Sequence, residues 1–128
     1  MKFRLVIISF VFLAATACLK EKTEGITVSD VVFEQRMNEK DVQLVDVRTS
    51  DEFSSGHLIN AMNIDVKADD FDVKVTNLDK QKPVLVYCKS GGRSSKAVEK
   101  LKNLGFTNIV ELDGGITSWK ANGKPIEN

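Results

Sequence analysis

Residues 83–104 constrain the fold most, because they place a buried strand, a glycine turn and an amphipathic helix in direct succession. Residues 83–87 (PVLVY) are rich in β-forming side chains and open with proline, which predicts a strand. From Ser94 to Leu104, apolar residues recur at helical spacing and Gly105 follows, which predicts a helix with one buried face. Strand–turn–helix units of this kind build parallel sheets covered by helices.

The rest of the chain continues this alternation. Further strands are expected at 43–47, 61–64 and 108–112, and helical segments at 52–56, at 69–78 and from Gly115 onward. Ser29 is expected to cap a helix that carries Val31, Val32 and Met37 on its inner face. The prediction is an α/β fold with a mostly parallel central sheet and helices on both faces. In such sheets ligands gather at the carboxyl ends of the strands.

Charge and composition exclude several function classes. The 18 basic and 18 acidic residues cancel, so no cationic surface for nucleic acid is indicated. One histidine and two cysteines cannot supply a zinc site by themselves, and no cofactor is expected. A chain of 128 residues with 42% hydrophobic residues is long enough for one compact domain.

The first residues have the pattern of an export signal. Lys2 and Arg4 precede an uncharged run from Leu5 to Ala17, which ends in the small residues ATA and is followed by Cys18. This resembles the lipobox of bacterial lipoproteins, although leucine is more usual than alanine at position 15. The prediction is a signal peptide over 1–17, a lipidated Cys18 with a tether over 18–25, and a domain over 26–128. Ordinary secretion with cleavage at the same bond is the alternative.

The resemblance to a lipobox implies an exported protein, lipid-anchored in the bacterial cell envelope and facing the periplasm. Leu19 follows the acceptor cysteine and, by similarity to enteric sorting rules, favours the outer membrane over the inner one. If Cys18 is a thioether, Cys88 is the only free thiol and no disulfide can form within the chain.

Residues 88–93 (CKSGGR), the Cys88 loop, lie between the predicted strand and helix. Gly91 and Gly92 can adopt positive φ, so the loop can direct successive N–H groups at one centre, to which the helix N-terminus adds. A thiolate there is stabilised, and Lys89 and Arg93 add positive charge. Because the motif contains no histidine base, activation is expected from a lowered pKa. The alternative is a buried cysteine that ends a strand before an ordinary glycine turn.

Three blocks of the sequence, taken in order, resemble the rhodanese family. They are residues 46–64 (DVR, EF, GHL and NAMNI), residues 88–94 (CKSGGRS) and residues 112–125 (LDGGI, then W, G and P). Together they span nearly all of 28–126, as in a stand-alone single-domain member. Asn60 stands where the family usually has glycine, and Leu58 where isoleucine is usual.

This resemblance implies a rhodanese-like fold and a sulfurtransferase of the thiosulfate:cyanide type. The Cys88 thiolate would take a sulfane sulfur from a small anionic donor such as thiosulfate, and pass it from a persulfide to a thiol, cyanide or protein acceptor. Lys89 and Arg93 would attract the donor, and a monomer is expected. The outer sulfur would rest in a cradle formed by Lys89, Ser90, Gly91, Gly92, Arg93 and Ser94.

Two other function classes compete with sulfur transfer. The first is a rhodanese-like binding or persulfide-carrier module in the cell envelope without significant turnover. The second is phosphatase or arsenate reductase chemistry, since cell-cycle phosphatases related to rhodaneses have a similar loop. Those enzymes place five residues between cysteine and arginine, whereas four separate Cys88 from Arg93. The smaller ring suits a sulfur atom better than a tetrahedral phosphate.

Supporting roles are expected for several residues outside the loop. Asp46 and Arg48 follow the first core strand and are expected to brace the loop through charge-assisted hydrogen bonds. His57 is interpreted as a hydrogen-bonded structural residue, Glu52 as an acid at a helix start, and Trp119 as a core anchor.

A second pair of glycines, Gly114 and Gly115, leaves two interpretations open. They allow the backbone to approach the Cys88 loop closely, or they only form a turn.

Overall fold

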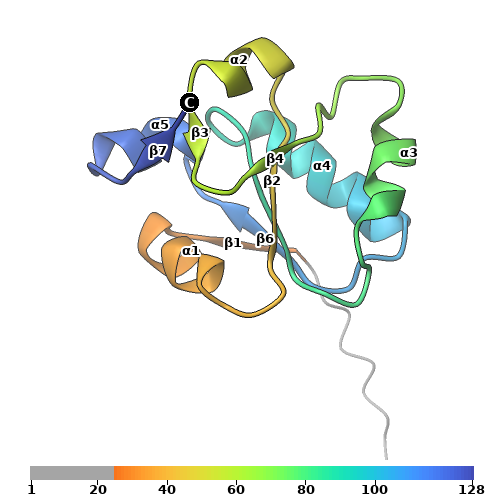
Figure 1. The fold of residues 1–128 in the computed structure, drawn as a ribbon. Helices are drawn as coiled ribbons and strands as arrows, with labels where there is room; N and C mark the ends of the chain where they lie inside the picture. The colour runs from red at the N-terminus through yellow and green to blue at the C-terminus, as the bar shows by residue number, and fades with distance from the viewer. Residues whose placement is uncertain (1–24) are drawn as a thin grey trace, which may run out of the picture.

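The computed structural model describes residues 25–128, so the predictions for the signal peptide, the lipidated Cys18 and most of the tether lie outside the described residues. A five-stranded sheet forms the centre, in the order β1-β6-β5-β2-β4, and every neighbouring pair is parallel (Figure 1). This confirms the predicted parallel sheet. The strands are β1 (Ile26–Val28), β2 (Gln43–Asp46), β4 (Met62–Asn63), β5 (Val84–Tyr87) and β6 (Ile109–Leu112).

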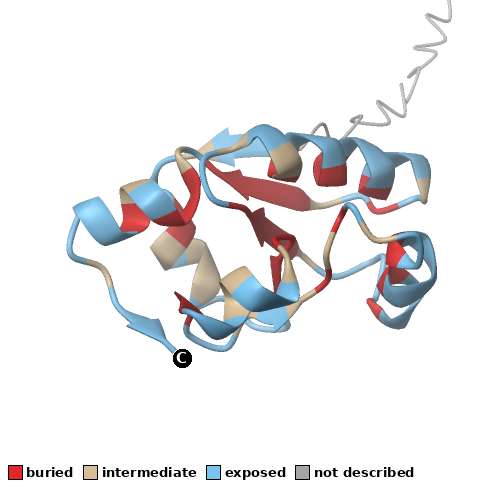
Figure 2. Cartoon of the chain, turned by 90° about the horizontal axis from the view of Figure 1, so that it is seen from above, coloured by how far each residue is buried: buried red, intermediate tan, exposed pale blue. Residues whose placement is uncertain are grey.

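Helices cover both faces of the sheet and divide the core in two. On one face pack α1 (Asp30–Met37) and α5 (Gly115–Ala121), around Phe33 and Trp119. On the other face pack α3 (Phe71–Lys74), the 3-10 turn Val75–Asn77 and α4 (Gly92–Asn103). Figure 2 shows the buried residues gathered in the central strands and on the sides of the helices that face them. The short helix α2 (Ser50–Ser54) follows β2.

Helix α1 confirms the predicted cap and only part of the predicted inner face, since Met37 packs against the core and the two valines do not. The Val32 N–H donates to the Ser29 hydroxyl at 3.4 Å, as expected of a cap. Phe33 is the buried residue of this helix, whereas Val31 and Val32 are 56% and 40% exposed. The prediction that these two valines face the core was wrong, because burying Phe33 rotates its two predecessors outward.

A small antiparallel ribbon, β3 (His57–Leu58) with β7 (Ile126–Glu127), was not predicted from the sequence. Two residues are too few to show the alternation of apolar and polar side chains by which a strand is recognised in a sequence. In the turn that follows β3, Asn60 has a φ of 66°. Asparagine is one of the few residues other than glycine that adopts this left-handed conformation readily, so the turn tolerates the replacement. Within residues 25–128 no helix is both long and apolar enough to cross a bilayer.

Candidate active site around Cys88

Cys88 lies directly after β5, at the carboxyl end of a central strand and immediately before α4. Cys88 is 1% exposed, so its Sγ lies at the floor of the loop. The Gly91 N–H donates to Sγ at 3.0 Å. Gly91 needs glycine because its φ is 125°, whereas Gly92 begins α4 without a positive φ.

The loop stabilises a thiolate despite its burial. Burial alone raises the pKa of the Cys88 thiol, because it removes water from the charged form. Hydrogen bonds to the thiolate outweigh this effect; they come from the Ser94 hydroxyl, when its hydrogen turns toward the sulfur, and from the backbone N–H groups of Ser94, Gly91 and Ser90. The net result is a pKa below the ordinary cysteine value. Lys89 and Ser90 are exposed at the outer side of the loop.

A cluster of hydroxyls and one buried acid lies beneath the loop, and sequence reasoning missed the acid. The Cys88 thiol donates to the Ser94 hydroxyl at 3.4 Å. Ser94 and Ser95 in turn donate to Oε1 of Glu111, at 2.6 and 2.9 Å. Glu111 comes from β6, and a single acid in an otherwise apolar strand (IVEL) was the signal that could have revealed it.

Arg93 is placed differently from the sequence expectation. Its guanidinium forms two hydrogen bonds with the Glu52 carboxylate, at 2.6 and 2.9 Å, which ties the start of α4 to α2. The hydrogen bond from Arg93 lowers the pKa of Glu52 to about 2. Arg93 is thus already paired with a carboxylate, and its charge is largely neutralised toward an incoming anion. Glu52 does lie in the first turn of α2, as predicted, but its main partner is Arg93.

Gly115 packs directly against the Cys88 loop. The first interpretation of the glycine pair, close approach of the backbone to the loop, is therefore confirmed for Gly115. A Cβ on Gly115 would lie 2.5 Å from the carbonyl oxygens of both Cys88 and Lys89. These carbonyls accept from the N–H groups of Ile116, at 2.9 Å, and Thr117, at 3.1 Å. The first turn of α5 therefore holds the beginning of the loop through close backbone contact. Gly114, with a φ of 73°, forms the turn itself.

Asp46 and Arg48 form a buried network on the opposite face of β5. Both oxygens of the Asp46 carboxylate accept hydrogen bonds from the Arg48 guanidinium. Oδ2 also accepts from the Tyr87 hydroxyl at 2.7 Å. The same hydroxyl accepts from the Leu58 N–H at 3.0 Å, and Arg48 donates to the Gly56 carbonyl at 2.7 Å. Burial and the Asp46 charge raise the pKa of Tyr87 far above its ordinary value. The pair thus braces Tyr87, the residue before Cys88, and makes no hydrogen bond to the loop itself.

His57 and Trp119 lie in structural positions. The His57 ring stacks on Phe53 with centroids 3.7 Å apart, and its Nδ1 lies 2.9 Å from the Phe53 carbonyl oxygen. Trp119 is 1% exposed and donates from Nε1 to the Pro125 carbonyl at 2.9 Å. Neither ring forms a hydrogen bond with the Cys88 loop.

A cavity of about 230 Å³ lies beside the loop, between α2 and α5. Lys89 from the loop and Lys120 from α5 line it, together with Ile116, Thr117 and residues of the α2 region. Neither lysine forms a salt bridge within residues 25–128, whereas Arg48 and Glu52 in the same lining are already paired. The cavity therefore offers two uncommitted positive charges next to the carbonyl end of Cys88.

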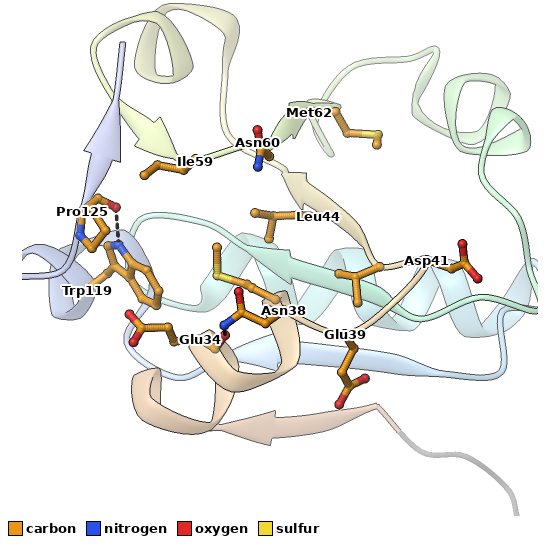
Figure 3. Close-up of a pocket in the computed structure, with 12 residues that line it drawn as sticks. Glu34, Asn38, Glu39, Asp41, Leu44, Ile59, Asn60, Met62, Trp119 and Pro125 are labelled. Carbon is orange, nitrogen blue, oxygen red and sulfur yellow. Dashed lines mark hydrogen bonds between the residues drawn. The ribbon is translucent and has the colours of Figure 1, made fainter.

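A larger cavity of about 690 Å³ lies on the other side of the sheet, between α1, β2 and the C-terminal segment (Figure 3). Its apolar lining includes Leu44 and Trp119, which belong to the core opposite Cys88. Glu34 at its rim is paired with Lys124 at 3.2 Å, so this rim charge is not free to select a ligand. Lys89 of the Cys88 loop lines the smaller cavity instead. No group of three or more potential metal ligands occurs among the described residues.

Comparisons with known proteins agree with this geometry. The profile of the Rhodanese-like domain family matches residues 29–122. A protein named sulfurtransferase from Allochromatium vinosum is 31% identical over 98 residues, which covers 77% of this chain and 90% of the relative. A thiosulfate sulfurtransferase of Coxiella burnetii is 35% identical over 86 residues, covering 66% of this chain and 78% of the relative. The crystal structure of a rhodanese-related protein from Thermoplasma volcanium superposes with a TM-score of 0.70 at 31% identity, covering 80% of this chain and 97% of that one.

Proposed function

Because this chain belongs to the rhodanese-like domain family, we propose that it is a sulfurtransferase in which Cys88 carries the transferred sulfur. One observation carries the proposal. Sγ of Cys88 lies at the floor of a loop whose Gly91 N–H points at it from 3.0 Å, directly before the N-terminus of α4. An N–H group and a helix N-terminus so placed stabilise negative charge on sulfur, both on a thiolate and on a persulfide.

The proposed reaction has two steps. In the first, the Cys88 thiolate attacks the outer sulfur of a donor such as thiosulfate; an S–S bond to Cys88 forms, the S–S bond of the donor breaks, and sulfite leaves with its electron pair. In the second, a nucleophile such as cyanide or a thiol attacks the outer sulfur of the persulfide and releases the thiolate. A covalent enzyme intermediate of this kind predicts ping-pong kinetics.

The cavity beside the loop supports a small anionic donor. Lys89 and Lys120 contribute the uncommitted positive charge there, so they, and not Arg93, are proposed to attract the anion. The 1% exposure of Cys88 favours a donor small enough to enter the loop. Phosphate chemistry is disfavoured by the same geometry, since binding a phosphoryl group through Arg93 would require breaking its two hydrogen bonds to Glu52.

A persulfide carrier without significant turnover is the second candidate. The burial of Cys88 favours it, because an acceptor must reach a sulfur at the floor of the loop before it can remove the outer atom. Both candidates share the first step and differ only in the second.

The experiment compares wild type with Cys88→Ser and, as a matched control, Cys18→Ser. Transfer from thiosulfate to cyanide is measured as thiocyanate formed, and the intact mass is measured after treatment with thiosulfate alone. We expect transfer and an added sulfur in wild type and in Cys18→Ser, and neither in Cys88→Ser. Equal transfer by wild type and Cys88→Ser would refute the assignment. An added sulfur on wild type without formation of thiocyanate would favour the persulfide carrier over the sulfurtransferase.

We also propose that the protein is exported and held in the cell envelope by a lipid on Cys18. The support is the sequence pattern alone: a basic start, an apolar run and small residues before the cysteine. Fractionation of cells that express wild type or Cys18→Ser tests this. An unchanged membrane fraction for Cys18→Ser would contradict the lipid anchor.

A further inference from the structure

Glu111 is a buried acid that the proposed mechanism does not use. It is 7% exposed on β6, and no cation of the described chain lies within salt-bridge distance of its carboxylate. Its partners are hydroxyls: Ser94 at 2.6 Å, Ser95 at 2.9 Å and Thr27 at 3.4 Å. Because a buried carboxylate without hydrogen bonds is costly, these hydroxyls are what hold it in place.

The Ser94 hydroxyl has more partners than it has hydrogens. Its Oγ lies 2.6 Å from Glu111 Oε1, 3.1 Å from the Gly91 carbonyl oxygen and 3.4 Å from Cys88 Sγ. A serine donates only one hydrogen, and a carboxylate is the strongest acceptor of the three. The hydrogen therefore goes to Glu111, and Ser94 presents a lone pair to the sulfur. A lone pair suits an S–H donor and repels a thiolate.

We propose that Glu111 is a positioning residue that limits how strongly the loop stabilises the Cys88 thiolate: while the Glu111 carboxylate holds the Ser94 hydrogen, the thiolate can accept from the N–H groups of the loop but not from the Ser94 hydroxyl. The thiolate gains Ser94 as a donor only when that hydrogen turns away from Glu111. The inference rests on the proposed function for its catalytic meaning, since the thiolate is the form that attacks the donor. By the same effect Glu111 lowers the fraction of Cys88 that is present as thiolate, which is the form that oxidants attack.

The remaining charged groups around Cys88 are fixed independently of Glu111. Arg93, on α4, is paired with Glu52 of α2 and lies within the electrostatic influence of Asp65. Lys89 of the loop is exposed. A change at Glu111 leaves all of these groups in place, so its effect on the sulfur is separable from theirs.

The test is the pH profile of iodoacetamide alkylation at Cys88 in Glu111→Gln and wild type, read by mass spectrometry on the peptide that contains Cys88. Glutamine has the same shape but no charge, and its amide N–H can donate to Ser94, which frees the serine hydrogen for the sulfur. We expect the midpoint to move down by about one pH unit, which is about tenfold faster alkylation below both midpoints. An unchanged or higher midpoint would overturn the proposal.

Two further variants separate this role from a general effect of charge. In a Ser94→Ala background, Glu111→Gln is expected to move the midpoint by less than half as much; an equal shift would show that Glu111 does not act through Ser94. Glu111→Asp keeps the negative charge but places it farther from Ser94. We expect its alkylation midpoint to move down as well, by less than in Glu111→Gln. If Glu111→Gln does not fold, as judged by its thermal melt, the aspartate variant decides, and no downward shift there overturns the proposal. Alkylation needs no sulfur donor, so a failure of sulfur transfer is recognised separately in the thiosulfate mass experiment.

Discussion

Replacing Glu52 by glutamine tests how much the Arg93 pair contributes to the fold at the active site. The pKa of Glu52 falls from an ordinary 4.5 to about 2 because Arg93 hydrogen-bonds to its carboxylate. At about 1.4 kcal/mol per pKa unit this corresponds to about 3 kcal/mol. The Glu52 side chain is 32% exposed, however, so solvent screening reduces the expected contribution to about 1 kcal/mol.

The sign of the pH dependence follows from the lowered pKa. The stabilisation is present above the unfolded value of 4.5 and is lost as the pH falls from 4.5 toward about 2. Glu52→Gln is therefore expected to lower the free energy of unfolding by about 1 kcal/mol at neutral pH, with the difference from wild type shrinking across this acid range. Urea denaturation followed by circular dichroism measures both quantities.

Asp51→Asn is the matched control for this experiment. Asp51 lies in the same first turn of α2 but forms no salt bridge within residues 25–128. It therefore reports the loss of a helix-start charge without the loss of an ion pair. Equal destabilisation by Asp51→Asn and Glu52→Gln, or a loss that does not depend on pH, would refute the assigned role of the pair.

The remaining predictions concern the surroundings of the loop. Tyr87→Phe leaves the buried Leu58 N–H without a partner and removes one of the hydrogen bonds to Asp46, which keeps those from Arg48, so urea denaturation should show a loss of about 1–3 kcal/mol; a loss below about 1 kcal/mol would contradict the network. Gly115→Ala places a Cβ at a φ of 57° and 2.5 Å from backbone of the loop, so it should cost at least about 1–2 kcal/mol and lower sulfur transfer; wild-type values for both would show that the contact is not needed. Lys120→Ala should raise KM for thiosulfate several-fold at low salt and leave kcat nearly unchanged, and a KM that does not respond would remove this lysine from donor binding.

Local patterns explain why much of the fold was predictable from the sequence. The strand β5, the turn after it and α4 are encoded within one stretch, and the helix begins two residues before the predicted Ser94. The cap by Ser29 likewise depends on neighbours three residues away. Val31 and Val32 were misplaced because a short helix with several apolar residues does not reveal which one faces the sheet. Only packing of Phe33 against Trp119 settles it.

The chemistry around Cys88 was only partly predictable for a related reason. The loop residues follow one another in sequence, so their meeting needs no tertiary information. Glu111 reaches the site because β6 pairs with β5, and Lys120 because α5 packs against the Cys88 loop; no spacing in the sequence reports either distance. Arg93 was expected to face the donor because the sequence does not show that Glu52, 41 residues earlier, neutralises it first.

The antiparallel ribbon β3–β7 has a practical consequence for anyone who produces this protein. Ile126 pairs with Leu58, and the Leu58 N–H donates to the hydroxyl of Tyr87, the residue before Cys88. Two successive contacts and one peptide bond thus connect Ile126 with the nucleophile. A truncation after Pro125 removes the first of these contacts, and a purification tag fused directly after Asn128 is separated from it by only two residues. Amide hydrogen exchange at Leu58 would report whether an altered C-terminus has loosened the support of the active site.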